Sequence, residues 1–180
     1  GPNPPGHYIA VDAAGRCTFT YTPTSAAVAP HVVTATYLWC GAADVVAETG
    51  DRTLLDALQR LWQDVTTRKM YVTGGAAALH FGEVTRETFR RWPRDSVHEA
   101  FGAEFQLPNR TAYNETCANI GNAMWNWRML ALEGEARYAD LIETTLYNAV
   151  LVGLSLDGQS YFYQNPLASD GTHRRQPWFG

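Results

Sequence analysis

Residues 51–65 read DRTLLDALQRLWQDV and have the pattern of an amphipathic helix. Asp51 is a typical N-cap residue, and the apolar residues that follow it fall on one wide stripe of a helix. These are Leu54, Leu55, Leu58, Leu61, Trp62 and Val65. Because such a stripe must be buried against a neighbouring element, the stretch predicts a mainly α-helical fold.

The chain contains two pairs of predicted helices with the same plan. In the first pair, residues 31–48 form a helix that ends at Gly50, a typical C-cap, and the helix described above follows. The second pair covers residues 116–132 and 138–152, joined by a Glu-Gly-Glu turn. The apolar positions of its first helix are Ile120, Met124, Trp127, Met129 and Leu130. Repeated helical hairpins bury their stripes by stacking, so we predict part of an α/α toroid.

The remaining segments differ in character from the helical pairs. Residues 7–22 alternate like a short β-hairpin, and together with the linker that follows they make residues 1–30 a separate segment. Residues 71–114 are irregular, and a loop this long in a compact domain is usually either a functional lid or disordered. Residues 161–164 predict a short strand.

The composition excludes several classes of protein. The 180 residues match about one domain, and 46% hydrophobic against 18% charged residues exclude disorder. A net charge of −4 argues against nucleic-acid binding. The sequence contains no run of about 18 apolar residues, the length that a membrane-spanning helix needs. Three scattered cysteines make a disulfide framework improbable, and nothing indicates a cellular compartment. The chain starts without Met and stops at PWFG, so we expect it to be part of a longer protein.

Two stretches, HEAFG at residues 98–102 and YNETC at residues 113–117, concentrate the reactive side chains. On a regular helix, Glu115 and Cys117 would point about 200° apart, but in an extended lead-in to a helix they could converge on one centre. A carboxylate and a thiolate are both suitable zinc ligands. The alternative is a plain helix start, capped by Asn114 or Thr116, with Cys117 in the core.

Four further residues are candidates for a site. Glu99 has an apolar-leaning setting that could raise its pKa, as a general acid requires, although a glutamate in a loop is usually solvated. His31 opens a helix and could simply cap it. Glu143 lies in an otherwise apolar helix, where a carboxylate must face water, a partner or a pocket. Tyr163 could be an ordinary packed strand residue.

Five stretches taken together resemble the β-L-arabinofuranosidases of glycoside hydrolase family 127. They are LWQDVTTRKMYVTGG (61–75), HEAFG (98–102), LPN (107–109), YNETCANIG (113–121) and YFYQNPL (161–167). The resemblance covers about residues 31–180, and their order along the chain makes it specific.

The resemblance implies an (α/α)6 barrel, of which residues 31–180 would form a part, and a zinc-dependent retaining mechanism. By the match of motifs, Glu99 is the general acid/base, and Glu115 and Cys117 are two zinc ligands. The sugar would be contacted by His31, Glu143 and Tyr163.

The nucleophile of that family is a cysteine in a motif that follows the Pro-Trp-Phe segment. We therefore expect the nucleophile and the remaining zinc ligands beyond residue 180, and we expect the isolated fragment to be inactive. The implied substrate is an arabinose-containing oligosaccharide or glycan, and the family leaves open whether the full-length protein is a homo-oligomer. Two alternatives are a related barrel hydrolase for another rare plant sugar and a non-catalytic carbohydrate-binding relic.

Overall fold

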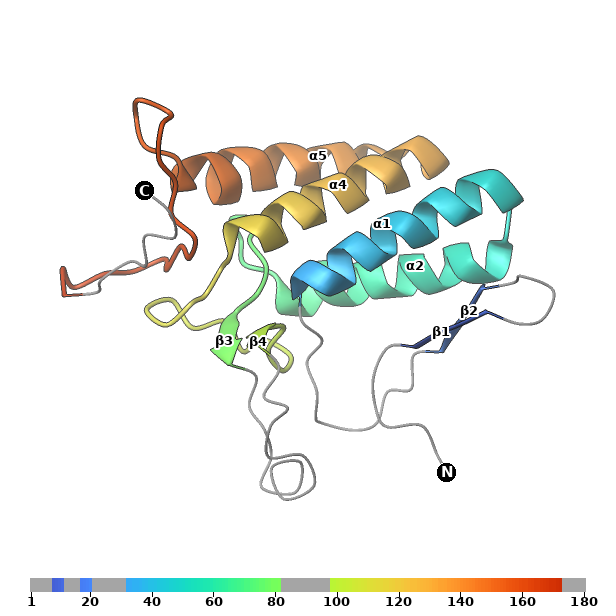
Figure 1. Cartoon of the computed structure of the whole chain (residues 1–180), viewed down its shortest axis with the longest axis horizontal. Coiled ribbons are helices and arrows are strands. Elements are labelled where there is room, and N and C mark those ends of the chain that lie inside the picture. Colours follow the sequence, from blue (N-terminus) through green and yellow to red (C-terminus); the bar gives the residue numbers. More distant parts are fainter. Residues whose placement is uncertain (1–7, 12–16, 21–31, 82–97, 173–180) are drawn as a thin grey trace, which may run out of the picture.

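The computed structural model describes residues 8–11, 17–20, 32–81 and 98–172, and within them it is mainly helical (Figure 1). The α-helices are α1 (Val32–Thr49), α2 (Arg52–Asp64), α4 (Thr116–Glu133) and α5 (Ala136–Thr145). A π-helical turn, Val65–Lys69, prolongs α2, and a π-helical turn, Leu146–Val150, followed by the 3₁₀ turn Leu151–Gly153, prolongs α5. In these residues, no helix combines the length and the apolarity needed to span a bilayer.

The residues at the helix ends occupy the capping positions that the sequence predicts. The carboxylate of Asp51 accepts hydrogen bonds from the backbone N–H groups of Thr53 and Leu54, at 2.9 and 3.1 Å, so Asp51 is the N-cap of α2 as predicted. Gly50 (φ 69°) follows the last residue of α1, and Gly134 (φ 68°) closes α4 in the left-handed conformation that glycine adopts easily. Both predicted helical pairs are confirmed.

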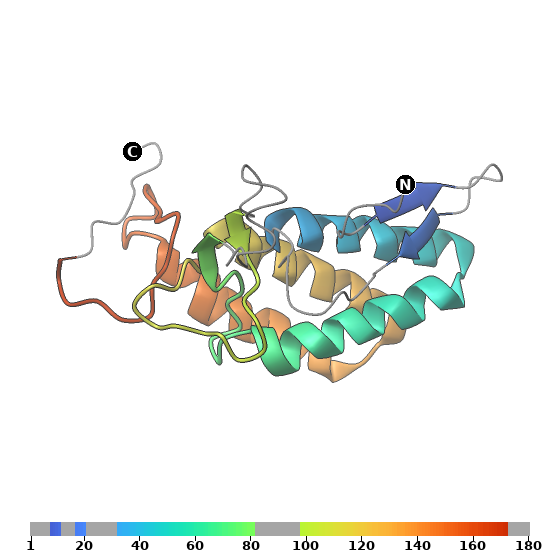
Figure 2. The same cartoon turned by 90° about the horizontal axis from the view of Figure 1, so that it is seen from below.

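The helices form two packed hairpins whose inner members lie side by side. α1 packs along α4, α2 packs on α1, and α5 packs on α4 (Figures 1 and 2). The first turns of α1 and α4 lie at the same end of the helices, next to a small sheet (Figure 1). This end of the molecule carries the candidate site.

The described strands form two antiparallel pairs. β1 (Tyr8–Val11) pairs with β2 (Cys17–Thr20), which confirms the predicted hairpin for its described residues. β3 (Leu79–Phe81) pairs with β4 (His98–Ala100). The description of residues 71–114 as irregular is therefore wrong at these two strands, because three-residue strands carry too little alternation to be recognised before their partner is known.

The strand predicted at residues 161–164 is also wrong. Among the described residues, only one isolated bridge, between Leu154 and Tyr161, involves this segment. Its other backbone groups bond to helix ends instead: Phe162 N–H donates to the Gly153 carbonyl at 2.8 Å, and the Tyr163 carbonyl accepts from Thr116 N–H at 3.0 Å. The segment is thus held extended by helix termini rather than by a neighbouring strand.

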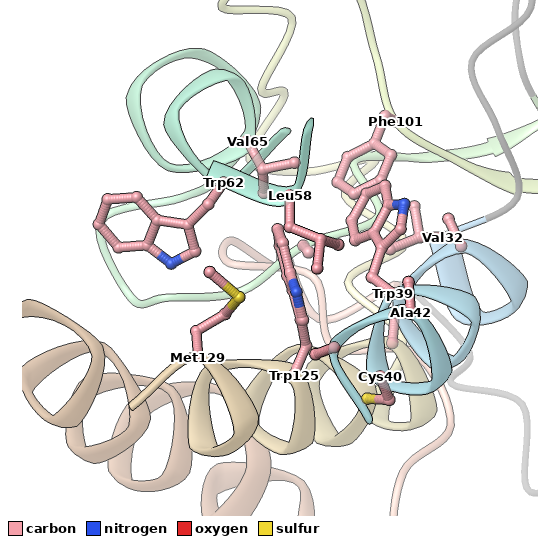
Figure 3. Packing of buried hydrophobic residues seen from close by; sticks show 14 of the residues in the cluster. Val32, Trp39, Cys40, Ala42, Leu58, Trp62, Val65, Phe101, Trp125 and Met129 are labelled. Carbon is pink, nitrogen blue, oxygen red and sulfur yellow. The ribbon is translucent and has the colours of Figure 1, made fainter. Parts of the chain in front are cut away.

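The apolar core joins three elements through aromatic rings. The Trp39 ring of α1 lies 4.6 Å from that of Trp125 of α4 and 6.0 Å from that of Phe101, measured between ring centroids (Figure 3). Leu58 and Trp62 of α2 point into the same cluster (Figure 3). Because Phe101 directly follows β4, this core also anchors the sheet that carries Glu99.

The buried face of α4 differs from the predicted one. Three of the residues assigned to its apolar stripe are exposed, namely Ile120, Met124 and Trp127. Met129 is buried as predicted, and the rest of the buried face is formed by Trp125 and by the amides Asn119, Asn122 and Asn126. Asparagine can occupy this face because each amide has a partner; the Asn126 carbonyl oxygen, for example, accepts from the Trp62 indole N–H at 2.6 Å.

Trp125→Ala is expected to lower the free energy of unfolding of the chain by about 3–5 kcal/mol, because it removes a fully buried ring and leaves a cavity. Trp127→Ala is the matched control, since that side chain is 64% exposed in the same helix. Urea denaturation of the 180-residue chain measures both. Equal losses in the two variants would contradict the placement of the α4 faces.

Candidate functional site

Glu115 stands at the junction between an extended segment and α4. Its backbone is extended (φ −65°, ψ 137°), α4 begins at the next residue, and its side chain is only 1% exposed. The expected extended lead-in is therefore confirmed. Capping by Thr116 or Asn114 is wrong, because the Thr116 hydroxyl donates to the Phe162 carbonyl at 2.7 Å and the Asn114 amide donates to the Asn165 carbonyl at 3.0 Å.

Glu99 is the central residue of β4 and has an unusual backbone. Its φ of 55° lies in the left-handed region, which a residue with a side chain occupies only at a cost of about 1–3 kcal/mol. Such strain concentrates at functional sites. One oxygen of its carboxyl, Oε1, accepts a hydrogen bond from the Tyr113 hydroxyl at 2.9 Å.

The carboxyl group of Glu115 lies at the centre of the site. The Glu99 carboxyl, the Tyr163 hydroxyl and the Cys117 thiol all lie close enough to it to shift its pKa. The structure thus brings together Glu99, Glu115, Cys117 and Tyr163, which the sequence predicted separately, from β4, from the start of α4 and from the segment after α5.

The electrostatics of this cluster disfavour negative charge. Burial, followed by the neighbouring Glu99 carboxyl, raises the pKa of Glu115 to about 7. Burial, followed by the Glu115 carboxyl, raises the pKa of the Cys117 thiol to about 11. Burial also raises the pKa of Tyr163, with Glu115 as the second cause. The Glu115 carboxyl and the Cys117 thiol are therefore favoured in their protonated forms, or beside a cation.

Glu115 and Cys117 are residues of the types that could ligate a zinc ion. The Glu115 Oε2 atom is buried and has no hydrogen-bond partner among the described residues, an arrangement that calls for a ligand. A carboxylate oxygen and a thiolate sulfur held beside each other are typical zinc donors. Within the described part of the chain, no group of three or more His, Cys, Asp or Glu side chains is arranged to hold a metal. These residues could thus supply two ligands of a larger set.

A network of buried amides holds the segment that leads to Glu115. The Asn119 amide donates to the Asn114 side-chain oxygen at 2.9 Å and accepts from the Ala76 N–H at 2.8 Å. The Asn165 amide donates to the Asn114 carbonyl at 3.2 Å. Asn114 has a φ of 43°, so this network stabilises a backbone turn that aims the next side chain, Glu115, at Glu99.

The structure describes only one of the two remaining predicted site residues. His31 and residues 82–97 of the predicted lid lie outside the described residues. Glu143 lies on α5 and is exposed, and no contact given for the described residues links it to Glu99 or Glu115. Its role as a sugar contact, like that of His31, stays a prediction.

The sequence analysis assigned no role to Tyr113, although its hydroxyl bonds to Glu99. The one signal was its place in the stretch YNETC, two residues before Glu115. The side on which it lies could not be predicted from this spacing, because Asn114, with a φ of 43°, interrupts the alternation of an extended segment. The partner of the hydroxyl could not have been found this way, because β4 lies 14 residues before Tyr113.

Known proteins with similar sequences and structures belong to one family. The family described as "Beta-L-arabinofuranosidase, GH127 catalytic domain" matches residues 21–180. A non-reducing end β-L-arabinofuranosidase from Bifidobacterium longum is 37% identical over 161 residues, which cover 83% of this chain and 22% of that protein.

Solved structures agree. A glycoside hydrolase superposes with a TM-score of 0.73 at 49% identity, over 82% of this chain and 26% of its own. A GH127 β-arabinofuranosidase superposes with a TM-score of 0.70 at 44% identity, over 83% of this chain and 21% of its own. A GH127 β-L-arabinofuranosidase from Geobacillus stearothermophilus T6 superposes with a TM-score of 0.65 at 42% identity, over 76% of this chain and 19% of its own. The chain thus spans about a fifth to a quarter of the length of these relatives. It belongs to the catalytic domain of glycoside hydrolase family 127, the β-L-arabinofuranosidase family.

Proposed function

We propose that the protein containing this chain is a zinc-dependent retaining glycoside hydrolase that releases β-L-arabinofuranose from plant-type glycans. The observation that carries the proposal is the convergence of Glu99 with Glu115 and Cys117 in one partly buried cluster. Two segments separated in sequence supply these groups, and the resemblance to the family implies that they serve acid/base catalysis and zinc binding.

Glu99 is suited to the proton transfers of such a reaction. As an acid, it would protonate the departing glycosidic oxygen while the bond to the sugar carbon breaks. As a base in the second half of the reaction, it would take a proton from the attacking water. The nucleophile that the family resemblance implies, a cysteine, is expected outside these 180 residues.

The zinc ion would be held by Glu115 and Cys117 together with ligands from outside these residues. A bound Zn²⁺ supplies positive charge, which favours the thiolate and carboxylate forms of its ligands. Tyr163 lies close enough to Glu115 to shift its pKa, and its hydroxyl would help to orient that ligand, an outer contact of the kind that metal sites commonly use. This contact also gives Tyr163 a position beside the site, where its proposed contact with the sugar could be made.

We further propose that the two helical hairpins are part of an (α/α)6 barrel. The described helices leave large apolar side chains exposed, among them Trp127 of α4 and Tyr147 in the turn after α5, both 64% exposed. Further hairpins stacked beside these two would cover such side chains, as the plan of an α/α toroid requires.

The test is hydrolysis of synthetic glycosides by the full-length protein. We expect release of arabinose from aryl β-L-arabinofuranosides, with the first-formed product retaining the β configuration by NMR, and no release from the α anomers. Cleavage of another furanoside or pyranoside instead would favour the related hydrolase. If the zinc-loaded protein cleaves none of a broad glycoside panel, the hydrolase proposal fails and the carbohydrate-binding relic is favoured.

A further inference from the structure

Tyr113 is the most firmly fixed polar side chain beside Glu99. The residue is 3% exposed, and its hydroxyl donates to Glu99 Oε1 at 2.9 Å. A tyrosine hydroxyl is protonated at neutral pH, and in this geometry it is the donor to the carboxyl.

The surroundings of Tyr113 hold its hydroxyl in one place. Its N–H donates to the Ala78 carbonyl at 3.2 Å, and its own carbonyl accepts from the Asn165 N–H at 3.0 Å. Its ring stacks on that of His80 of β3, with centroids 4.5 Å apart and planes 3° apart. The residues that contact its backbone and ring, Ala78, Asn165 and His80, thus belong to the segments that build the site. The hydroxyl cannot turn away from Glu99 without disturbing these contacts.

The direction of the hydrogen bond has a chemical consequence. A tyrosine hydroxyl that donates to Oε1 makes this oxygen the acceptor of the Glu99 carboxyl. A proton on the carboxyl therefore belongs on the other oxygen, Oε2. Because Glu99 is held by a three-residue strand and a strained backbone, a fixed side-chain partner adds the orientation that the backbone alone does not give.

We propose that Tyr113 is a positioning residue for the proposed general acid, Glu99: its hydroxyl engages Oε1 and thereby presents the proton on Oε2 to the leaving group. The inference rests on the proposed function. In the step concerned, the bond between the sugar carbon and the glycosidic oxygen breaks and both electrons go to that oxygen. The oxygen takes the proton from Oε2, which leaves Glu99 as a carboxylate, while the enzyme's nucleophile bonds to the sugar carbon.

Tyr113→Phe in the full-length protein tests the inference, because it removes only the hydroxyl and keeps the stacked ring. Two β-L-arabinofuranosides are compared by kcat/KM, one with an alkyl leaving group that needs protonation and one with a dinitrophenyl leaving group that departs without it. We expect kcat/KM to fall about 10-fold or more for the alkyl glycoside, as the loss of one hydrogen bond predicts, and less than about 3-fold for the dinitrophenyl glycoside.

Tyr71→Phe is the matched control, since this buried tyrosine donates to a backbone carbonyl, that of Pro108, at 2.8 Å. It should change kcat/KM for both substrates by the same small factor. In a Glu99→Gln background, Tyr113→Phe should have no further effect on the alkyl glycoside. An equal loss for both substrates, or no loss, overturns the role of Tyr113 while the proposed function stands. If wild-type protein cleaves neither substrate, the proposed function fails and the inference falls with it.

Discussion

Glu99→Gln is expected to lower kcat/KM for alkyl β-L-arabinofuranosides by about 10²–10⁴-fold, the usual contribution of general acid–base catalysis. The amide keeps the size of the side chain and can still accept from the Tyr113 hydroxyl, but it has no acidic proton for the leaving oxygen. Steady-state hydrolysis by the full-length protein measures the loss.

Glu48→Gln provides the control, because Glu48 is an exposed residue near the end of α1 and lies away from the cluster. Its kcat/KM should equal that of the wild type. If Glu99→Gln retains wild-type turnover of alkyl glycosides, Glu99 is not the acid, and the arrangement of the cluster must serve another purpose.

Cys117→Ser and Glu115→Gln are each expected to weaken zinc binding by more than about 100-fold, since even outer contacts of a metal site commonly contribute 10–100-fold. Each change replaces one of the two proposed donors by a poorer one while nearly keeping its volume. Zinc content after dialysis, measured by elemental analysis, and zinc affinity in a competition titration are the readouts. Chelation of the wild type should abolish its hydrolase activity in parallel, and zinc should restore it.

Cys40→Ala controls for the loss of a thiol elsewhere. Cys40 is buried in α1, and its thiol points to the Gly121 carbonyl at a Sγ–O distance of 3.9 Å, outside the site. It should keep a full complement of zinc. Undiminished zinc in both Cys117→Ser and Glu115→Gln would rule these residues out as ligands.

The helical hairpins could be predicted from the sequence because their signals are local. Asp51, Gly50 and Gly134 mark helix ends through the conformation of a few neighbouring bonds, and the stripe of α2 is apolar throughout. The face of α4 could not be predicted in this way. Its buried amides find partners such as Trp62 and Ala76 in other elements, and those pairings depend on the complete fold.

The site was predictable to a similar extent. Spacing and residue type indicated that Glu115 and Cys117 could converge in an extended lead-in to a helix, but they left a plain helix start open as the alternative. The contact between Glu99 and Glu115 and the hydrogen bond of the Tyr113 hydroxyl could not be predicted, because they depend on β4 pairing with β3 and lying beside α4. Glu143 is exposed on α5 in this part of the protein, and its contact with the sugar stays a prediction.

The amides along α4 also fix how far the helix can slide. Apolar side chains tolerate a lengthwise shift, because contact between hydrocarbon surfaces has no required direction. A shift by one helical turn, about 5.4 Å, would separate Asn119, Asn122 and Asn126 from their partners, and each stranded amide would cost about 1–3 kcal/mol. Packings in which α4 is shifted along its axis are therefore less stable. The hydrogen bonds of these amides thus fix the position of α4 along its axis, and with it the position of Glu115 and Cys117 relative to Glu99.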